Sequence, residues 1–370
     1  MKKVVQFITD ICDGGAETLV KDYALLLDKK EFEVVLLTRY PIAETANSKH
    51  LRNSGIRIVS LNKSGSKPAK IWNKLTFKFR MPVLMKKFLN EEKPDVIHAH
   101  LAQLCYLNTV ADELKGIKLF YTCHNIVSHY FSGKNEKERI AAENLIKNND
   151  LRMIALHDDM KNELNVMFKV DNSVVIRNGI DFSRFRNITV TKEEKRKEIG
   201  IPENAFVMGH IGRFAEQKNH PFLVDVFNEV AKARDDAFLL MVGAGDTASV
   251  IEKLNNYGLN GRYMILSNRT DIPELLKAMD VFVFPSLFEG LGIVLIEAQV
   301  AGLKCVVSDN IPSEAFRTGL ISSLSLKESA EKWRDEILRG AVNTDIVSDI
   351  DNYDINKEIR RLESLYNGII

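Results

Sequence analysis

The sequence predicts an α/β protein with two domains, each built on a parallel, doubly wound β-sheet. Short, β-prone apolar runs alternate with amphipathic helical stretches along the chain, and this order is typical of parallel sheets. The chain has 370 residues, which suits two domains of ordinary size. Its composition, 45% hydrophobic and 27% charged, is that of a globular protein.

The expected strands are short apolar runs that are bounded by turn residues. In the first half they are Lys3–Thr9, Phe32–Thr38, Gly55–Leu61, Pro94–His100, Lys118–Asn125, Arg152–Leu156 and Ser173–Arg177. In the second half they are Phe206–Ile211, Ala237–Val242, Tyr263–Leu266, Val281–Phe284 and Cys305–Ser308.

Helices are expected where helix-forming residues carry an apolar stripe, at Ala16–Leu27, Lys70–Leu89, Leu291–Ala301 and Asp354–Tyr366. Because proline lacks the N–H group that a helix interior needs, Pro82 is expected to interrupt the second of them. The polar, charge-rich stretch Asn178–Gly200 is expected to contain the domain boundary.

One stretch combines a strand exit, a glycine-containing loop and a helix start. Phe288–Gln299 follows the apolar run Val281–Phe284, and helix-forming residues begin at Leu291. Backbone N–H groups and the positive end of a helix dipole at such a turn suit a phosphate group. Glu289 in the loop and Glu297, about two helical turns further on, can accept hydrogen bonds from sugar hydroxyls. Taken alone, two glutamates at this spacing are more typical of solvated surface positions.

Two further turns carry residues that suit a ligand. The strand Phe206–Ile211 is followed by Arg213 and, five residues later, by Lys218. An arginine fork and a lysine ammonium at one strand exit can hold both phosphates of a diphosphate without a divalent cation. Near the N-terminus, Gly14-Gly15 lies at a strand–helix turn, where glycines let a ligand approach the backbone closely.

Together these motifs resemble those of the retaining, nucleotide-sugar-dependent glycosyltransferases of family 4, which have the GT-B fold. The matches follow the family order over nearly the whole chain: Gly14-Gly15-Ala16-Glu17, Asn178-Gly179-Ile180-Asp181, Gly212-Arg213-Phe214 with Gln217-Lys218-Asn219, and Glu289 with Glu297. Within the family, the chain resembles bacterial enzymes of capsule and exopolysaccharide assembly. It departs from the family at Val294, where many members have proline, and at Ser267-Asn268, where many have glycine.

The resemblance implies two Rossmann-like domains that face an inter-domain cleft. Residues 1–180 would form an N-terminal, acceptor-binding domain. Residues 181–352 would form a C-terminal domain that binds the nucleotide sugar. A terminal helix within residues 353–370 would cross back to the first domain.

The resemblance also implies roles for individual residues. Arg213, Lys218 and the backbone around Gly290-Leu291-Gly292 would bind the diphosphate and stabilise the charge that develops on the leaving oxygen. Glu297 would hold the ribose, and Glu289 would hold the donor hexose. The residues expected to act in catalysis are Glu289, His124, Arg213 and Lys218.

Four more positions complete the expected site. The loop Ser267-Asn268-Arg269-Thr270 resembles the one that meets the nucleobase through backbone groups, so Arg269 is assigned to donor binding. Gly15 is assigned to both the donor and the acceptor. Gly14 and His100 are assigned to the acceptor side, and His124 is expected to contact the donor sugar from the first domain.

The expected reaction is transfer of a hexose or N-acetylhexosamine from a nucleoside-diphosphate sugar, UDP-linked, to an acceptor hydroxyl with retention of configuration. The resemblance implies no metal and no cofactor, and a glycan or a lipid-linked molecule as acceptor. Two other classes remain open at this point. One is a GT-B sugar-nucleotide 2-epimerase, which needs additional acid–base side chains, and the other is a non-catalytic sugar-nucleotide-binding subunit.

The segment Thr45–Asn90 contains no acidic residue and eleven Lys and Arg residues, although the net charge of the chain is only +1. Aromatic residues lie among these cations: Trp72, Phe77, Phe79 and Phe88. A basic surface with apolar anchors suits an anionic membrane leaflet, and a solvated basic face is the alternative. The sequence therefore predicts a cytoplasmic protein that is peripheral at the inner face of the plasma membrane, with no nucleic-acid partner.

No metal site is expected, because His98 and His100 lack further ligands at a recognisable spacing. The four cysteines show no paired spacing and are expected to be free thiols. No apolar run approaches 18 residues, so no membrane-spanning helix is expected. No signal peptide is expected either, because the chain enters its first strand within a few residues.

Overall fold

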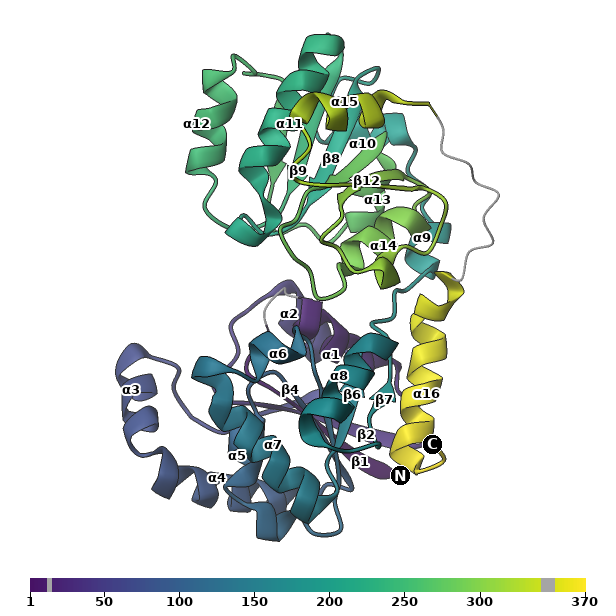
Figure 1. Cartoon of the computed structure of the whole chain (residues 1–370). Coiled ribbons are helices and arrows are strands. Elements are labelled where there is room, and N and C mark those ends of the chain that lie inside the picture. Colours follow the sequence, from purple (N-terminus) through teal and green to yellow (C-terminus); the bar gives the residue numbers. More distant parts are fainter. Residues whose placement is uncertain (12–14, 341–349) are drawn as a thin grey trace. The chain divides into compact units, whose positions relative to one another are not determined.

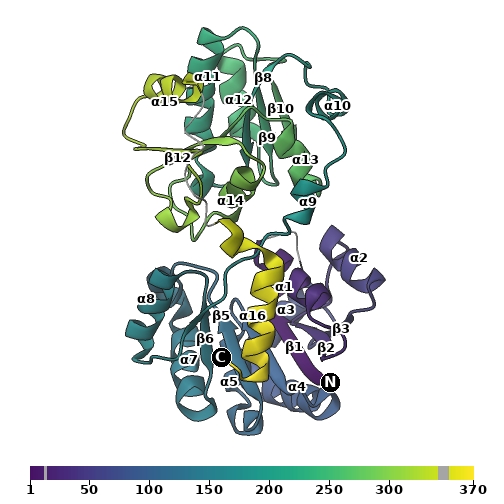
Figure 2. The same cartoon turned by 90° about the vertical axis from the view of Figure 1, so that its right-hand side faces the viewer.

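The computed structural model describes residues 1–11, 15–340 and 350–370, and it forms two compact units. The first unit contains Met1–Gly179 and Ile355–Ile370, and the second contains Ile180–Asp354. Each unit is an α/β domain with its own parallel sheet, as Figure 1 and Figure 2 show. The predicted fold class is confirmed.

The sheet of the first unit has seven parallel strands in the order β3-β2-β1-β4-β5-β6-β7. They are β1 (Lys2–Ile8), β2 (Phe32–Thr38), β3 (Arg57–Ser60), β4 (Val96–His100), β5 (Lys118–Thr122), β6 (Arg152–Ala155) and β7 (Val174–Val175). From β1 the chain builds outward to β3 on one side, and from β4 it builds outward to β7 on the other. Parallel sheets bind ligands beyond the strand ends at such a switch point.

Helices cover both faces of this sheet. They are α1 (Gly15–Leu26), α2 (Ala46–Asn53), α3 (Lys67–Leu75), α4 (Phe77–Glu92), α5 (Leu104–Asn108), α6 (Val127–Tyr130), α7 (Glu136–Asn149), α8 (Asp158–Phe168) and α16 (Ile355–Asn367). One core joins the sheet to α4, α5, α7 and α8, and another joins it to α1 and α16.

The break between α3 and α4 lies at Thr76, so the predicted break at Pro82 is wrong. Pro82 lies inside α4. Thr76 is the C-cap of α3, with φ −96° and ψ 6°, and its N–H and hydroxyl both donate to the Trp72 carbonyl, at 2.9 and 2.8 Å. Its own carbonyl accepts the first bonds of α4, from Phe79 and Arg80. Thr76 is thus shared by the end of α3 and the start of α4, and a hydroxyl bonded back to the i−4 carbonyl is typical of a bend in a helix.

The last helix, α16, belongs to the first unit. Its apolar face is buried against strands β1, β4 and β5, with Ile355, Ile359, Leu362 and Leu365 next to Val4, Val96 and Phe120. Figure 2 shows α16 in yellow, lying along the sheet of this unit. Burial of such an amphipathic stripe is the main source of helix stability in a folded protein.

The sheet of the second unit has six parallel strands in the order β10-β9-β8-β11-β12-β13. They are β8 (Phe206–Ile211), β9 (Ala237–Val242), β10 (Tyr263–Leu266), β11 (Val281–Phe284), β12 (Lys304–Ser308) and β13 (Ile321–Leu324). The helices are α9 (Ser183–Arg186), α10 (Lys192–Glu198), α11 (His220–Ala233), α12 (Ala248–Asn256), α13 (Ile272–Lys277), α14 (Ile293–Val300) and α15 (Ala330–Leu338). Strand β13 was not predicted, because its serines hide the apolar pattern.

Candidate active site

The switch point of the second unit lies between β8 and β11. These strands pair with each other, and the chain builds outward from β8 to β10 on one side and from β11 to β13 on the other. The loop after β8 carries Arg213 and Lys218, and the loop after β11 carries Glu289. The structure therefore gathers three predicted site residues at the place where parallel sheets bind ligands.

Lys218 and Glu289 form an ion pair at this switch point. Lys218 ends the short 3₁₀ helix η3 (Glu216–Lys218), and its Nζ lies 2.7 Å from Glu289 Oε1. The two side chains are 14% and 7% exposed, so both charges are largely withdrawn from water. The ammonium also lies 4.5 Å from the centre of the Phe284 ring. Because burying two charges is unfavourable, such a pair is better explained by function than by stability.

Gln217 fixes the loop that carries Glu289. The Gln217 carbonyl accepts the N–H of Leu287 at 2.8 Å, and its amide donates to the Phe288 carbonyl at 2.9 Å. The same amide nitrogen lies 3.3 Å from Glu289 Oε2. Each carboxylate oxygen of Glu289 therefore faces one donor, Lys218 on Oε1 and Gln217 on Oε2, and the side chain is held in one orientation.

The turn from this loop into α14 requires a glycine at position 292. Gly292 has a φ of 78° and stands at the N-cap, so the predicted helix start at Leu291 is wrong by two residues. A Cβ on Gly292 would also lie only 3.3 Å from the Phe284 ring. Leu291 is buried, whereas Gly290 and Glu297 are partly exposed. The first N–H groups of α14 thus follow Gly290-Leu291-Gly292, where they can bind an anion.

Gly212 makes room for the stem of Lys218 at the end of β8. A Cβ there would lie 3.0 Å from Lys218 Cδ and 3.1 Å from His210 Nε2. Burial lowers the pKa of His210 well below its usual range, so this ring adds no charge beneath the lysine. Arg213, which follows Gly212, is exposed.

Arg269 forms ion pairs within the second unit. Its Nε donates to Asp271 Oδ1 at 2.7 Å, and its Nη2 lies 3.4 Å from Glu198 Oε1. The bond to Arg269 is the main reason why the pKa of Asp271 lies far below its usual range. The Arg269 guanidinium thus connects the loop 267–270 to α10. The expected contact with the nucleobase would then be made by backbone groups of this loop.

In the first unit the predicted residues lie at the carboxyl ends of strands. Gly15 begins α1, and a Cβ on it would meet none of the described residues within 4 Å. Its neighbour Gly14 lies outside the described residues. His100 ends β4, and His124 follows β5 by two residues.

The structure brings His100 and His124 together. His100 Nδ1 lies 3.1 Å from His124 Nε2, and His100 is fully buried. Burial lowers the pKa of both rings, that of His124 to about 4. Both rings are therefore neutral at pH 7, and each offers one donor and one acceptor.

The sequence analysis missed the residues that hold these histidines. His100 Nε2 lies 2.8 Å from Gln6 Oε1, and Gln6 Nε2 donates to the Tyr366 hydroxyl at 2.9 Å. The available signal was a glutamine in the middle of the apolar run Val4–Ile8. A buried amide needs partners, but nothing in the sequence says that one of them lies 360 residues away.

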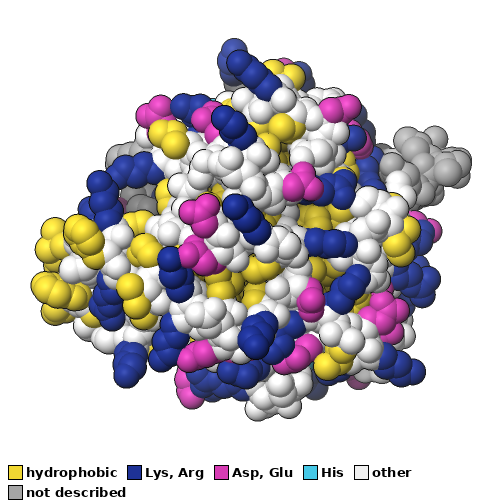
Figure 3. Space-filling view, turned by 90° about the horizontal axis from the view of Figure 1, so that it is seen from below, with side chains coloured by type: hydrophobic (Ala, Val, Ile, Leu, Met, Phe, Trp, Pro, Cys, Tyr) yellow, Lys and Arg dark blue, Asp and Glu magenta, His cyan; other side chains and the backbone are white. Residues whose placement is uncertain are grey.

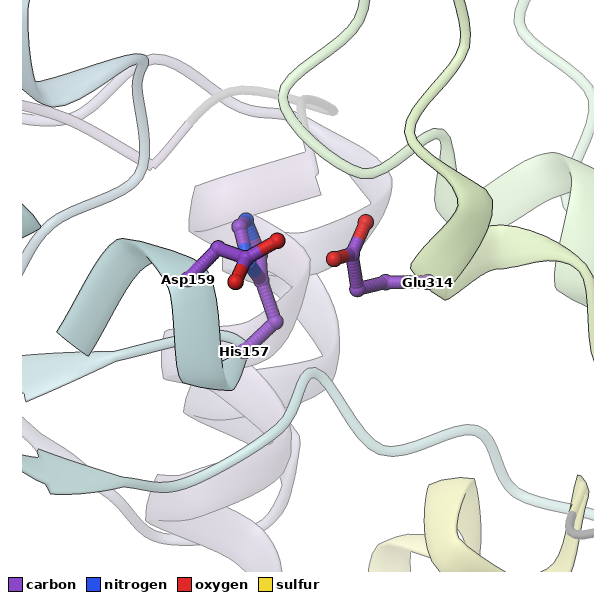
Figure 4. Close-up of side chains that lie close together, drawn as sticks. All are labelled: His157, Asp159 and Glu314. Carbon is purple, nitrogen blue, oxygen red and sulfur yellow. The ribbon is translucent and has the colours of Figure 1, made fainter. Parts of the chain in front are cut away.

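His157, Asp159 and Glu314 carry groups of the kind that ligate metal ions. Figure 4 shows His157 and Asp159 at the start of α8, together with Glu314 from the 3₁₀ helix η4 (Ser313–Ala315). The first two residues belong to the first unit and Glu314 to the second, so these side chains do not form a site within either unit. We assign no metal to them.

Within the described parts of the chain, none of the helices is both long and apolar enough to cross a membrane. Three of the four cysteines fall in those parts, Cys105, Cys123 and Cys305, and all three are free thiols, as predicted. Cys12 lies outside them.

Two family models match the chain, and together they span most of it. The model described as "Glycosyltransferase Family 4" matches residues 13–184, and the one described as "Glycosyl transferases group 1" matches residues 191–335. The chain therefore belongs to the group 1, family 4 glycosyltransferases, which are nucleotide-sugar-dependent enzymes. The resemblance inferred from the motifs is confirmed.

Two curated relatives illustrate the similarity. The "Capsular polysaccharide biosynthesis glycosyltransferase CapH" of Staphylococcus aureus is 25% identical, over 99% of both chains. The "UDP-Gal:alpha-D-GlcNAc-diphosphoundecaprenol alpha-1,3-galactosyltransferase" of Escherichia coli is 30% identical, over 61% of both chains. The chain is thus related to bacterial glycosyltransferases of polysaccharide and capsule assembly.

A solved structure shows the same fold. The Anabaena protein Alr3699/HepE, in complex with UDP, superposes with a TM-score of 0.76 at 18% sequence identity, and the match covers all of both chains. The expected GT-B fold is confirmed.

Proposed function

We propose that the protein transfers a hexose or an N-acetylhexosamine from a UDP-sugar to an acceptor hydroxyl, with retention of configuration and without a metal. The observation that carries this proposal is the buried pair of Lys218 and Glu289 at the β8–β11 switch point, beside the start of α14. UDP as the carrier is supported by two relatives, the UDP-galactose-dependent enzyme of Escherichia coli and the Anabaena protein in complex with UDP.

The pair suits a reaction in which a diphosphate leaves. Negative charge grows on the leaving oxygen in the transition state, and fixed donors aimed at that oxygen supply the largest catalytic contribution. We assign this role to Lys218, Arg213 and the N–H groups that follow Gly290-Leu291-Gly292. An ammonium has three N–H donors, so Lys218 can hold Glu289 and a phosphate oxygen together.

The hydroxyl groups of the transferred sugar and of the ribose need hydrogen-bond acceptors rather than cations. We assign Glu289 to a hydroxyl of the transferred sugar, because Lys218 and Gln217 already fix its carboxylate. Glu297 is assigned to the ribose and His124 to a second hydroxyl of the transferred sugar. Gly15 is assigned to donor and acceptor, Gly14 and His100 to the acceptor side, and Arg269 to the loop beneath the base.

Product analysis tests this proposal against the two alternatives. The purified protein is incubated with a panel of UDP-sugars, with and without lipid-linked and soluble glycan acceptors. We expect a new glycoside with retained configuration and, without acceptor, slow release of the free sugar. An isomerised donor would show a 2-epimerase instead, and binding without any product would show a non-catalytic subunit.

We also propose that the acceptor is lipid-linked and that α3 and α4 bring the protein to an anionic membrane. Five large apolar side chains within residues 71–83 are exposed, each by 60% or more: Ile71, Trp72, Leu75, Phe79 and Val83. The exposed lysines Lys67, Lys70, Lys74 and Lys78 lie among them. Figure 3 shows apolar side chains at the left-hand edge, over α3, with Lys and Arg side chains beside them.

Only some of the side chains that were predicted to anchor the protein in a membrane are exposed. Phe88 is buried and Phe77 is half-buried in the core, so of the four predicted aromatic anchors only Trp72 and Phe79 are exposed. Asn73 faces inward, where it accepts a bond from Arg80 Nη1 at 2.5 Å that ties α3 to α4. With Asn73 inward, the neighbouring apolar and basic side chains face solvent, as on a helix that lies in a membrane interface.

Vesicle sedimentation tests the membrane contact. The protein should sediment with phosphatidylglycerol vesicles at low salt and be released at 1 M salt, where the screening length is about 3 Å. Changing Lys70, Lys74 and Lys78 to Glu should abolish sedimentation, since each well-placed cation contributes about 1 kcal/mol. The matched control reverses three exposed lysines elsewhere in the first unit, Lys29, Lys30 and Lys115. Wild-type protein that stays in the supernatant at low salt would make this a solvated face and favour a soluble acceptor.

A further inference from the structure

One face of the first unit's sheet carries a row of buried polar side chains. Gln6 on β1 is paired with His98 on β4, and His100 on β4 is paired with Thr122 on β5. His98 and His100 are two residues apart, so all four side chains point to the same face. All four are fully buried, beneath the α16 residue Tyr366.

Tyr366 connects this row to the last helix. Its hydroxyl accepts a bond from Gln6 Nε2 at 2.9 Å and lies 2.6 Å from His98 Nδ1. The hydroxyl still has its single proton to donate, and His98 Nδ1, at 2.6 Å, is the acceptor within reach of it. His98 therefore carries its own proton on Nε2, which lies 2.7 Å from Thr122 Oγ1.

The side-chain amide of Gln6 also determines where the protons lie on His100 and His124. Gln6 Oε1 has no proton, so His100 must donate to it from Nε2, over 2.8 Å. His100 is neutral, because burial lowers its pKa, and its Nδ1 therefore bears no proton. The group that completes the 3.1 Å contact with this nitrogen is an N–H on His124 Nε2.

We propose that Gln6 and Tyr366 are positioning residues, which hold His124 in the tautomer with its proton on Nε2. The other nitrogen, Nδ1, is then a hydrogen-bond acceptor. This role rests on the proposed function: Nδ1 accepts a bond from a hydroxyl of the transferred sugar, while Nε2 is anchored on His100. His124 thus orients the sugar and transfers no proton.

Nitrogen NMR on protein with ¹⁵N-labelled histidine tests the tautomer without any substrate. The His124 signals are identified by their loss in His124→Gln. At pH 7 we expect Nδ1 of His124 to resonate as an unprotonated ring nitrogen and Nε2 as a protonated one. The opposite assignment, with the proton on Nδ1, would overturn the proposal.

Two variants test whether the chain of bonds causes this preference. In Tyr366→Phe the amide of Gln6 loses its anchor and can turn over, so both tautomers of His124 should appear. Gln6→Met removes both bonds and should have the larger effect. Tyr23→Phe is the matched control, because Tyr23 stacks on His98 in the same buried layer and its hydroxyl has no hydrogen-bond partner among the described residues. An unchanged His124 tautomer in both test variants would sink the idea.

Kinetics then connects the tautomer to the reaction. With the sugar donor that the panel identifies, kcat should fall about tenfold in Tyr366→Phe, by analogy with the partners that orient metal-bound histidines, which contribute 10- to 100-fold. The donor KM should change little, since the diphosphate contacts lie in the other unit. If wild-type protein shows the expected tautomer but transfers no sugar, the proposed function fails and the positioning role stands. If Tyr366→Phe shifts the tautomer but keeps full kcat, the link to catalysis fails.

Discussion

The two units share one sheet architecture but carry different chemistry at their switch points. At β1 and β4 of the first unit the buried polar side chains are neutral: an amide, a phenol and imidazoles. At β8 and β11 of the second unit the corresponding place holds the ion pair of Lys218 and Glu289. A cation beside a helix start suits an anionic diphosphate, whereas neutral donors and acceptors suit hydroxyl groups. Topology thus sets where a ligand binds, and the residues that leave the strands set which ligand.

The largest effect should come from neutralising the charged switch point. Lys218→Met should lower kcat/KM by about 100- to 1000-fold, the usual loss for a donor that stabilises a leaving oxygen. Steady-state kinetics measures this, and Lys253→Met, which breaks the surface pair with Asp225, is the matched control.

A second variant separates catalysis from stability. Lys218→Met leaves the Glu289 carboxylate buried without its cation, which by itself destabilises a protein. The double variant Lys218→Met/Glu289→Gln removes both charges and should recover the melting temperature but not the activity. Activity that returns with stability would show that the pair is only structural.

Glu289→Gln should act mainly on kcat, by about tenfold or more, because this carboxylate is assigned to the reacting sugar. The amide keeps the shape of the side chain but loses the charge that pairs with Lys218. Donor-saturation kinetics checks the result. A variant with normal kcat and a raised KM would assign Glu289 to a part of the donor that does not react.

Glu297→Gln should act mainly on the donor KM rather than on kcat. It should raise the donor KM several-fold and leave kcat nearly intact, because the ribose does not react. UDP inhibition should weaken in proportion. If kcat falls more than KM rises, the roles of the two glutamates are exchanged.

Acid should weaken the neutral layer of the first unit. Burial lowers the pKa of His98, His100 and His124, the last to about 4, so the unfolded chain binds more protons below about pH 6.5. Stability is therefore complete above pH 6.5 and declines as the pH falls from there toward about 4. Each ring accounts for about 1.4 kcal/mol per pH unit in that range.

The second unit has two such rings, His210 and His220, against three in the first unit. The first unit should therefore lose more stability than the second just below pH 6.5. At lower pH the buried carboxyls of Glu138 and Glu358, whose pKa values burial raises, take up protons in the folded state and offset part of that loss. Native-state hydrogen exchange of amides in β4 and in β8, corrected for the intrinsic rate at each pH, measures this difference. Equal losses in the two units would contradict the prediction.

The smallest effect should come from chelation. EDTA should leave activity unchanged, because Lys218, Arg213 and the start of α14 are assigned the work of a divalent cation. If EDTA abolishes the activity and Mg²⁺ restores it, the reaction requires a metal. A divalent cation would then bind the diphosphate.

Strand positions could be predicted from the sequence because each buried strand is a compact apolar run with its own boundaries. Phe206–Ile211, Ala237–Val242 and Val281–Phe284 have the predicted bounds. The helix break was predicted at Pro82, because proline was the obvious signal, but it lies at Thr76. An apolar pattern can be read from one stretch of sequence, whereas the backbone conformation of a single threonine cannot.

The candidate site also has one part that could be predicted from the sequence and one part that could not. Lys218 and Glu289 were identified separately from their strand exits, but their contact joins residues 71 positions apart and needed the structure. Gln6 and Tyr366 were missed because side chains from opposite ends of the chain meet only in the folded unit. A local sequence pattern can show which side chains could bind a ligand, but the residues that contact those side chains are determined by the fold.

The position of α16 has a consequence for synthesis. The strands of the first unit emerge first from the ribosome, yet Tyr366 and the apolar face of α16 emerge only after the whole second unit has been made. At about 5–20 residues per second, translation of residues 180–354 takes roughly nine to thirty-five seconds. During that time the β1–β4–β5 face of the nascent chain lacks its cover, and a nascent-chain chaperone can bind it. The second unit has no such delay, because all of its sheet and core come from one uninterrupted stretch.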